Sequence, residues 1–297
     1  MAAKAPAAQG SLARPPRPRR ALPVGTTARH AVLIFFCIVT MLPLVWVVMM
    51  SLKPLQEAYL VPVKFFPTHP TLSAYSFSFS HIPDLPRYFL NSVIATTGGL
   101  IGVLVISSLA GYALVWLPFP GRRILLAVLV ASLFFPTQIT SVIGIYQVDN
   151  DLNLLDTLPG LIFPYIAINL VVSTFIMTGV FRAIPKELLE AARADGCTVL
   201  RTFGQIVLPL CLNGLVVVGM INFIAMWGEY LLAYTLTSTS ASRTLTVGMA
   251  EATAGTGVWE WPQISAVFTV MIALPIVLFI ALQRWFMKGL MEGALRQ

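Results

Sequence analysis

Charged residues are scarce in this chain. Asp, Glu, Lys and Arg together make up 10% of its 297 residues, whereas 57% of the residues are hydrophobic. A soluble domain needs a charged exterior and cannot be built at that ratio. The mean hydropathy of +0.83 points the same way. The composition therefore excludes an ordinary soluble domain and indicates a polytopic membrane protein.

The residues that carry most enzyme and metal chemistry are also few. Three cysteines occur, and no pair has metal-ligand spacing or suggests a disulfide framework. The three histidines lie outside the long apolar stretches, and no Ser/His/Asp or Cys/His arrangement accompanies them. We therefore predict no catalytic residue and no metal site. The residues concerned are Cys37, Cys197, Cys211, His30, His69 and His81.

Six apolar stretches are long enough to cross a bilayer, which requires roughly 20 residues per helix. They cover about residues 31–50, 89–116, 124–146, 158–180, 206–234 and 264–286. We therefore expect an all-α membrane protein with six transmembrane helices over residues 31–290. Residues 1–30 are rich in Ala, Pro and Arg, which predicts a disordered tail followed by an uncleaved first span.

Basic residues are distributed unequally between alternate connections, fifteen on one side and four on the other. This positive-inside bias predicts that both termini and the segment around Glu190 are cytoplasmic. The arginines of the tail are expected to contact anionic membrane lipid. Because the basic residues are spread along membrane flanks, nucleic-acid binding is not expected. The smaller set is Lys53, Lys64, Arg87 and Arg243.

A polar segment at residues 184–205 separates the fourth and fifth apolar stretches. Pro185 suits the first turn of a helix, and Gly196 can take the left-handed conformation that closes one. Thr198 is a plausible N-cap for a second helix, with an apolar stripe at Val199, Leu200, Phe203 and Val207. Two readings are open at this point: a docking element for another protein, or an amphipathic helix on the lipid surface.

The residues of this segment also resemble a known motif. Glu190-Ala191-Ala192, Gly196 and Ile206-Val207-Leu208-Pro209 have the spacing of the EAA motif of ABC-importer permeases. The stretch from Trp227 to Ala233 is similar to the Trp-Asn-Glu-Phe pattern of the MalG-like carbohydrate permeases, and it departs from that pattern at Gly228 and Tyr230. The resemblance covers the chain from about residue 30 to residue 290.

The resemblance implies a type I ABC importer permease fold with a core at about 88–284, in the plasma membrane of a bacterium or archaeon. It implies three kinds of partner: a second permease subunit, two ATPase subunits that hold ATP and Mg, and an extracytoplasmic solute-binding protein. Membrane lipid is the fourth expected partner, on the evidence of the basic tail. No cofactor is expected in this chain, which lacks the G-x-x-x-x-G-K-[ST] phosphate loop. Within the outer loop at 235–263, residues at about 237–262 would reach toward the binding protein. The residues implied to couple to the ATPase are Glu190, Ala191, Ala192, Asp195 and Gly196.

The implied substrate is a carbohydrate, and we expect a disaccharide such as trehalose or maltose. Glucans and glycerol phosphates are also compatible with the family. Glu229 is the only acidic residue within a predicted span, where a carboxylate is costly and is by default a functional candidate. It fits either a structural contact or a contact with the substrate pathway. Buried amides usually form interhelical hydrogen bonds, and pore lining is their alternative role. The candidates for the pathway are Gln138, Asn169, Asn222, Trp227 and Glu229.

Two other functions are compatible with the sequence. A secondary transporter would use Glu229 for proton coupling, although no basic or histidine partner lies within a span. A membrane scaffold without transport activity is the second alternative. Dependence of uptake on a partner ATPase, and its survival when the proton gradient is collapsed, distinguishes the importer from both.

Overall fold

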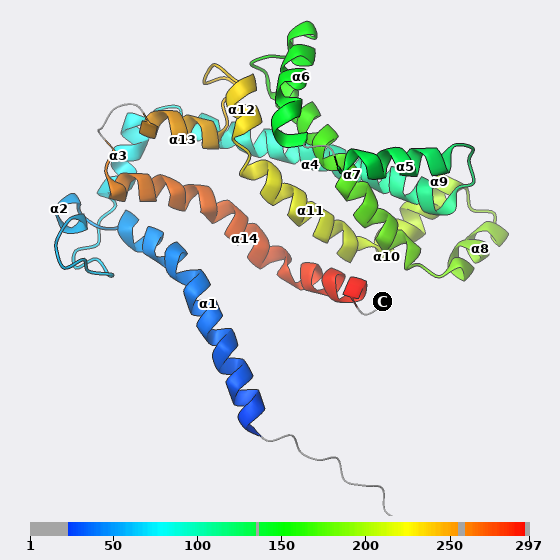
Figure 1. Cartoon of the computed structure of the whole chain (residues 1–297), viewed down its shortest axis with the longest axis horizontal. Coiled ribbons are helices and arrows are strands. Elements are labelled where there is room, and N and C mark those ends of the chain that lie inside the picture. Colours follow the sequence, from blue (N-terminus) through cyan, green and yellow to red (C-terminus); the bar gives the residue numbers. More distant parts are fainter. Residues whose placement is uncertain (1–22, 135–136, 255–258, 295–297) are drawn as a thin grey trace, which may run out of the picture. The chain divides into compact units, whose positions relative to one another are not determined.

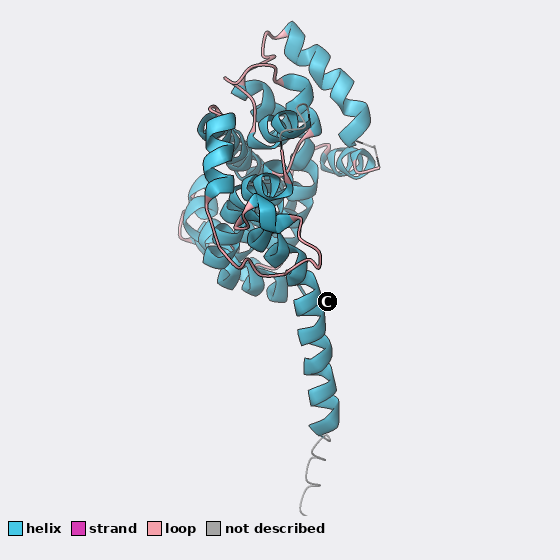
Figure 2. Cartoon of the chain, turned by 90° about the vertical axis from the view of Figure 1, so that its left-hand side faces the viewer, coloured by secondary structure: helices cyan, strands magenta, loops and turns pink. Residues whose placement is uncertain are grey.

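The computed structural model describes residues 23–134, 137–254 and 259–294, with side chains over 28–134, 141–254 and 259–289. Its described residues form helices joined by loops, without a strand (Figure 2). The chain divides into two units, Met1–Trp46 and Val47–Gln297. The helices are α1 (Pro23–Ser51), α2 (Leu55–Ala58), α3 (Ser73–His81), α4 (Leu85–Trp116), α5 (Arg122–Ser132), α6 (Thr137–Asp151), α7 (Leu158–Arg182), α8 (Lys186–Ala194), α9 (Val199–Thr202), the π-helix η1 (Phe203–Val207), α10 (Leu208–Leu210), α11 (Leu212–Trp227), α12 (Leu231–Leu236), α13 (Leu245–Ala254) and α14 (Trp261–Ala294).

The first unit consists, in its described part, of most of α1. This helix begins at Pro23, earlier than the predicted start near residue 31, so the last residues of the predicted tail are helical. The rest of that tail lies outside the described residues. Apolar side chains from Val32 to Val45 are exposed over this stretch, as a span that faces lipid or another chain requires.

The second unit is built around α4 and α7, which run side by side (Figure 1). Glycines of α4 allow this close contact: a Cβ at Gly98 or Gly102 would lie 2.9 or 2.3 Å from the Cδ1 atom of Ile162 or Ile166 on α7. Small residues at such positions let membrane helices approach closely. The van der Waals contacts made there stabilise the pair, because lipid provides no hydrophobic driving force between helices. α11 and α14 then pack against each other and α11 packs on the α4–α7 pair.

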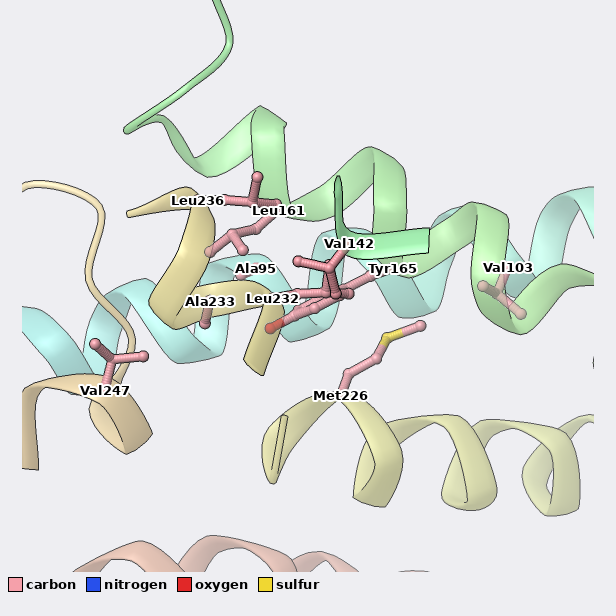
Figure 3. Packing of buried hydrophobic residues seen from close by; sticks show 10 residues of the cluster. All are labelled: Ala95, Val103, Val142, Leu161, Tyr165, Met226, Leu232, Ala233, Leu236 and Val247. Atoms are coloured by element: carbon pink, nitrogen blue, oxygen red, sulfur yellow. The ribbon is translucent and has the colours of Figure 1, made fainter. Parts of the chain in front are cut away.

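Two clusters of buried residues lie toward opposite ends of this unit. The α12-end cluster joins α4, α6, α7, α11, α12 and α13 and is drawn in Figure 3; it comprises Ala95, Val103, Val142, Leu161, Tyr165, Met226, Leu232, Ala233, Leu236 and Val247. The α8-end cluster joins α4, α7, α8 and the chain from η1 to α11; it comprises Tyr112, Met177, Phe181, Ile184, Leu189, Phe203, Val207, Cys211 and Val218.

Four of the predicted spans are single apolar helices, at Ala28–Ser51, Leu85–Trp116, Leu158–Arg182 and Trp261–Gly289. The predicted fifth span is a bent pair, Val199–Leu210 and Leu212–Trp227, with an angle of 77° between its parts. The predicted third span, 124–146, falls on two shorter helices, α5 and α6. Within the described residues, length and composition therefore support four spans, or five with the bent pair, and the count of six is not confirmed.

The predicted outer loop at 235–263 has more structure than expected. It contains the end of α12 and the whole of α13, a helix of 10 residues that packs on α4 and α14. Residues 255–258 of the loop lie outside the described residues. The segment between α1 and α4, which is rich in prolines and aromatic residues, likewise contains two short helices, α2 and α3. Both of these helices contact α14.

Candidate functional site

α8 forms the centre of the segment at 184–205, and its sequence explains where it starts and which side it exposes. Pro185 precedes the helix in an extended conformation, Glu187 lies in the first turn and Arg193 in the last. These charges suit the positive N-terminal and negative C-terminal ends of the helix dipole. Apolar residues recur three apart at Leu189 and Ala192, and these two are the buried residues of the helix.

Gly196 ends this helix in the predicted left-handed conformation, with φ of +76°. The N–H of Gly196 donates to the carbonyl of Arg193 at 3.0 Å, and the N–H of Cys197 donates to that of Ala192 at 3.0 Å. This pair of bonds is the Schellman arrangement, which satisfies the last carbonyls of a helix. The prediction for Gly196 is confirmed. So is the N-cap at Thr198, whose hydroxyl accepts from the N–H of Arg201.

The residues predicted to couple to an ATPase lie mostly on the surface of this segment. Glu190, Ala191, Asp195 and Gly196 are exposed, whereas Ala192 is buried against the bundle. The exposed set forms one continuous side of α8 and the turn after it. The structure thus brings these residues together and leaves one side of the helix open to a partner.

The opposite side of α8 is held by Leu189, a residue that the sequence pattern did not distinguish from its neighbour Leu188. Leu189 is 2% exposed and packs in the α8-end cluster. In that cluster the rings of Tyr112, Phe181 and Phe203 lie within van der Waals range of each other, with centroids 5.1 to 6.4 Å apart. Aromatic pairs in such geometry add to the stability of burial. Leu189 therefore joins α8 to α4, α7 and the chain leading into α11.

The predicted apolar stripe after Thr198 is half correct. Phe203 and Val207 are buried, but Val199 and Leu200 are exposed. The reason is the backbone, because residues 203–207 form a π-helix. A π-turn inserts an extra residue into the helical repeat, so a stripe drawn with one helical period does not continue through it.

Glu229 lies just beyond the C-terminus of α11, so the helix is shorter than the predicted span. Its carboxylate oxygens accept hydrogen bonds from the backbone N–H groups of Leu232, at 2.7 Å, and Ala233, at 3.0 Å, in the first turn of α12. The hydroxyl of Tyr165 donates to the same carboxylate at 3.2 Å. The side chain satisfies N–H groups that have no partner within their own helix, so the contacts of Glu229 are those of a helix cap.

Trp227 is 5% exposed and fills the contact between α11 and α14. Its indole N–H donates to the carbonyl of Met271 at 3.0 Å. The ring stacks on Phe223 and meets Phe89 edge to face. Trp227, one of the candidates for the substrate pathway, therefore presents no free ring face in this conformation.

The three amides of the predicted pathway have different surroundings. Asn222 is buried and donates to the hydroxyl of Ser173 on α7 at 2.8 Å, an interhelical bond of the usual kind. Asn169 is half-buried and donates to the carbonyl of Tyr165, one turn earlier in α7, at 2.8 Å. Gln138 belongs to α6, but its side chain lies outside the described residues.

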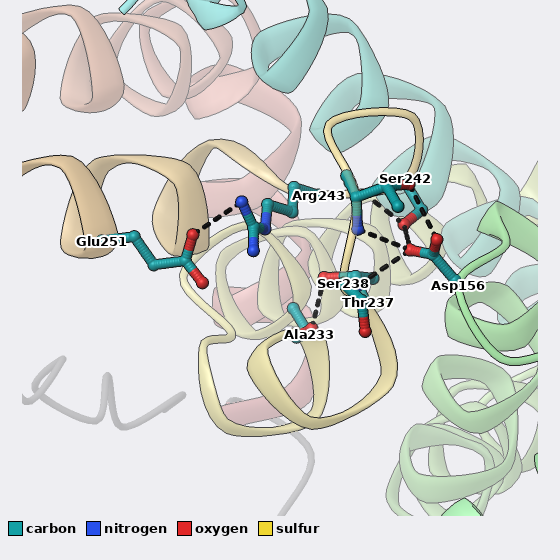
Figure 4. Close-up of polar contacts among 8 residues, drawn as sticks. Asp156, Ala233, Thr237, Ser238, Ser242, Arg243 and Glu251 are labelled. Carbon is teal, nitrogen blue, oxygen red and sulfur yellow. Dashed lines mark hydrogen bonds and ion pairs between the residues drawn. The ribbon is translucent and has the colours of Figure 1, made fainter.

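Asp156 is a functional candidate that the sequence reasoning missed. It lies in the connection between α6 and α7, and its carboxylate accepts from the N–H groups of Ser238 (2.8 Å) and Thr239 (2.9 Å) and from the hydroxyls of Thr239 and Ser242 (Figure 4). Burial acts to raise the pKa of Asp156, but these hydrogen bonds outweigh it and hold the pKa well below its usual range. The connection from α12 to α13 is thereby fixed to the connection before α7.

Asn91 and Ser92, at the start of α4, hold the same connection from its other side. The amide of Asn91 donates to the carbonyls of Ala241, at 3.1 Å, and Arg243, at 2.9 Å. The hydroxyl of Ser92 accepts from the N–H of Leu245, the first residue of α13, at 2.8 Å. The guanidinium of Arg243 forms an ion pair of 2.8 Å with Glu251 on α13 (Figure 4). The Ser- and Thr-rich composition of this connection was visible in the sequence, but its partners were not.

Comparison with known proteins gives matches over most of the chain. Residues 102–292 match the family described as "Binding-protein-dependent transport system inner membrane component". The chain is 34% identical over 254 residues to a sulfoquinovosyl glycerol transport system permease protein of Agrobacterium fabrum, covering 86% of this chain and 88% of that one. It is 34% identical to a trehalose transport system permease protein of Mycobacterium tuberculosis, covering 86% and 92%.

Two further matches concern another sugar permease and the fold. The chain is 32% identical over 269 residues to a diacetylchitobiose uptake system permease protein of Streptomyces coelicolor, covering 90% of this chain and 88% of that one. A crystal structure of a bacterial ABC transporter involved in the import of the polysaccharide alginate matches with a TM-score of 0.76 and 20% identity, covering 92% of this chain and 100% of the other. This structural likeness concerns the fold alone.

Proposed function

Because this chain belongs to the family of binding-protein-dependent inner-membrane transport components, we propose that it translocates a disaccharide such as trehalose or maltose by ATP-driven alternating access. It is a permease subunit of a carbohydrate ABC importer in the plasma membrane, and it is not itself an enzyme. The importer to which it belongs includes ATPase and binding-protein partners. The choice of a disaccharide is supported by the names of its trehalose and diacetylchitobiose relatives.

The observation that carries the mechanism is the two-sided structure of α8. One side exposes Glu190 and Ala191, and the other buries Leu189 among aromatic rings that belong to α4, α7 and η1. In the proposed cycle, closure of two ATPase subunits with bound ATP and Mg pushes on the exposed side. The push passes through Leu189 into the bundle, and the spans of this chain and of a second permease subunit reorient around the substrate.

This role of α8 is tested by charge reversal on its exposed side. Glu190→Lys or Gly196→Asp is expected to abolish uptake while membrane insertion is retained. The matched control is Asp151→Lys, the same reversal at an exposed residue near the α12 end. Uptake of radiolabelled sugar by membrane vesicles and the amount of inserted protein are measured together. Normal uptake by the Glu190 variant would contradict the coupling role.

The proposed orientation has both termini and α8 in the cytoplasm, as the fifteen-to-four distribution of basic residues indicates. Cys197 is half-exposed in the turn after α8, so labelling of its thiol shows on which side of the membrane α8 lies. With Cys37 and Cys211 replaced by alanine, a charged maleimide that cannot cross membranes should label Cys197 in inside-out vesicles and not in intact cells. The reverse pattern would invert the topology. The binding protein would then have to meet the α8 end.

Proton-coupled transport through Glu229 is the less favoured function, because the carboxylate is engaged by two backbone N–H groups and the hydroxyl of Tyr165. Uptake should persist when a protonophore collapses the proton gradient and should stop when the ATPase subunits are removed. The opposite result would favour the proton-coupled transporter. A scaffold without transport activity would show no uptake in either condition. Identification of the sugar on the co-purified binding protein tests the disaccharide assignment.

A further inference from the structure

Two tyrosines form an exposed stacked pair on α12. Tyr230 immediately precedes this helix and Tyr234 lies one turn later, so both are on the same side of it. Their ring centroids are 5.5 Å apart with an angle of 21° between the planes. The residues are 42% and 52% exposed. Neither phenol hydroxyl has a hydrogen-bond partner within the part of the chain that the structure describes.

The opposite side of α12 fixes the direction of this pair. Leu232, Ala233 and Leu236 are buried in the α12-end cluster, together with residues of α4 and α7 (Figure 3). The carboxylate of Glu229 holds the first N–H groups of the helix. The tyrosine side is thus presented by a helix that is anchored at its start and along its buried side. A binding surface that is already organised loses less entropy when a ligand arrives.

The backbone around the pair is not one that lipid tolerates. α11 ends at Trp227 and α12 starts at Leu231, so residues 228–230 are non-helical, and α12 has only 6 residues. Irregular backbone at membrane depth occurs only where it is buried in protein or lines a water-filled cavity. The Glu229 carboxylate next to Tyr230 is a further group that hydrocarbon excludes. This end of α11 therefore borders protein or water.

The chemistry of the exposed side suits a carbohydrate. A tyrosine offers an apolar ring face, which packs on the C–H face of a pyranose, and a hydroxyl that bonds to sugar hydroxyls. Leu231 is exposed beside the pair and Thr235 is half-exposed, so the surface mixes apolar area with hydroxyl groups. Binding sites for small molecules have this combination of apolar lining and a few polar groups. Trp227, the aromatic candidate for the pathway, is buried and offers no such ring face.

We propose that Tyr230 and Tyr234 form a stacking platform for one pyranose unit of the transported carbohydrate, on the end of the substrate pathway opposite α8. This inference rests on the proposed function, since it concerns the sugar that the importer carries. It places the contribution of this chain to substrate recognition at the break between α11 and α12. The pair would bind the sugar before the spans reorient.

The test uses the complete importer, with its partner permease, ATPase subunits and binding protein, reconstituted in proteoliposomes. Uptake is measured as KM and maximal rate with radiolabelled trehalose, maltose and diacetylchitobiose as probes. The double variant Tyr230→Leu/Tyr234→Leu removes the rings, and Tyr230→Phe/Tyr234→Phe keeps them. Phe268→Leu, an exposed aromatic of α14, is the matched control. Basal ATPase activity and the yield of assembled complex are measured for each variant.

The leucine variant is expected to raise KM roughly tenfold, equivalent to about 1.4 kcal/mol, with assembly and basal ATPase activity unchanged. The phenylalanine variant should lose less, and the control should match the unsubstituted importer. An unchanged KM in the leucine variant overturns the platform. So does a loss of maximal rate that is the same in the leucine variant and in Phe268→Leu, because that result indicates that exposed aromatic rings anchor the protein in the membrane. If the double leucine variant does not assemble, Tyr234→Leu is compared with Tyr234→Phe by the same criteria. Absence of uptake by the unsubstituted importer for all three probes refutes the proposed disaccharide function instead, and the platform with it.

Discussion

Replacing Leu189 by alanine tests whether the packing of this one side chain holds α8 to the bundle. α8 has 9 residues, and an isolated helix of that length is marginal in water. Its position therefore depends on what it buries. Leu189 is 2% exposed among Phe181, Phe203 and other members of the α8-end cluster. Truncation of a buried leucine to alanine destabilises a protein by about 2–5 kcal/mol.

A loss of about 3 kcal/mol raises the population of locally opened α8 roughly a hundredfold. We expect this increase as faster amide hydrogen exchange over residues 186–196 in the purified complex without nucleotide. The neighbouring Leu188 provides the matched control, because it is the same residue type in the same helix but is 43% exposed. Leu188→Ala should change the local free energy by less than about 0.5 kcal/mol.

The functional readout is the number of sugar molecules transported for each ATP hydrolysed. Leu189→Ala should lower this ratio while the ATPase subunits remain bound, because the exposed side of α8 is intact. Leu188→Ala, on the side open to a partner, should act on ATPase binding if it acts at all. Equal exchange rates in the two variants, or a protected α8 in Leu189→Ala, would refute the reasoning. α8 would then be held by its partner and not by the bundle.

Substitutions at four other residues have defined outcomes. Gly160→Ala should prevent assembly of the importer complex, since the new Cβ would lie 2.3 Å from the backbone carbonyl oxygen of Leu154. Gly179→Ala, in the same helix, has open space around the new Cβ and should raise the thermal stability of the complex slightly. Gly196→Ala should destabilise the turn after α8 by about 1–2 kcal/mol through its positive φ, and Gly196→Asn by less, as measured by hydrogen exchange. Asp156→Asn should speed exchange over residues 237–244 roughly tenfold, the effect of about 1.5 kcal/mol for one charged hydrogen bond. The pKa of Asp156 in the folded protein lies below the unfolded value of about 3.9. The stabilisation by its carboxylate is therefore fully present above about pH 3.9 and is lost only as the pH falls through the folded pKa. Amide exchange over residues 237–244, corrected for the intrinsic rate, should thus not change between about pH 7 and about pH 5.

Hydropathy predicts the long straight helices and fails where the backbone departs from them. The spans at 89–116 and 158–180 correspond to α4 and α7 within a few residues. The predicted span at 206–234 runs past Trp227 because the residues that follow Glu229 are apolar. The helix does not continue because the carboxylate of Glu229 accepts hydrogen bonds from the N–H groups of Leu232 and Ala233, which a continuous helix would bond to its own carbonyls. A sum of hydropathy values contains no information about such hydrogen bonds.

In the candidate site too, the features that depend on adjacent residues could be predicted from the sequence, and those that depend on distant residues could not. Gly196 and Thr198 were predicted because a helix end is decided by a few adjacent residues. Leu188 and Leu189 look equivalent in the sequence. Which of them is buried depends on rings such as Tyr112, from an element far away in the chain. The role of Asp156 could not be read for the same reason, since its donors lie more than 80 residues later.

α4 has a consequence for how the two ends of the molecule communicate. Asn91, near its start, holds the connection before α13, and Tyr112, near its other end, belongs to the cluster that holds α8. The 21 residue steps from Asn91 to Tyr112 make about 31 Å of uninterrupted helix, a strut that bypasses the bend at Cys211. Linkage through such a strut runs in both directions. If this helix couples the two ends, a partner on α8 and a ligand on the connection before α13 would each change the affinity of the other by the same factor.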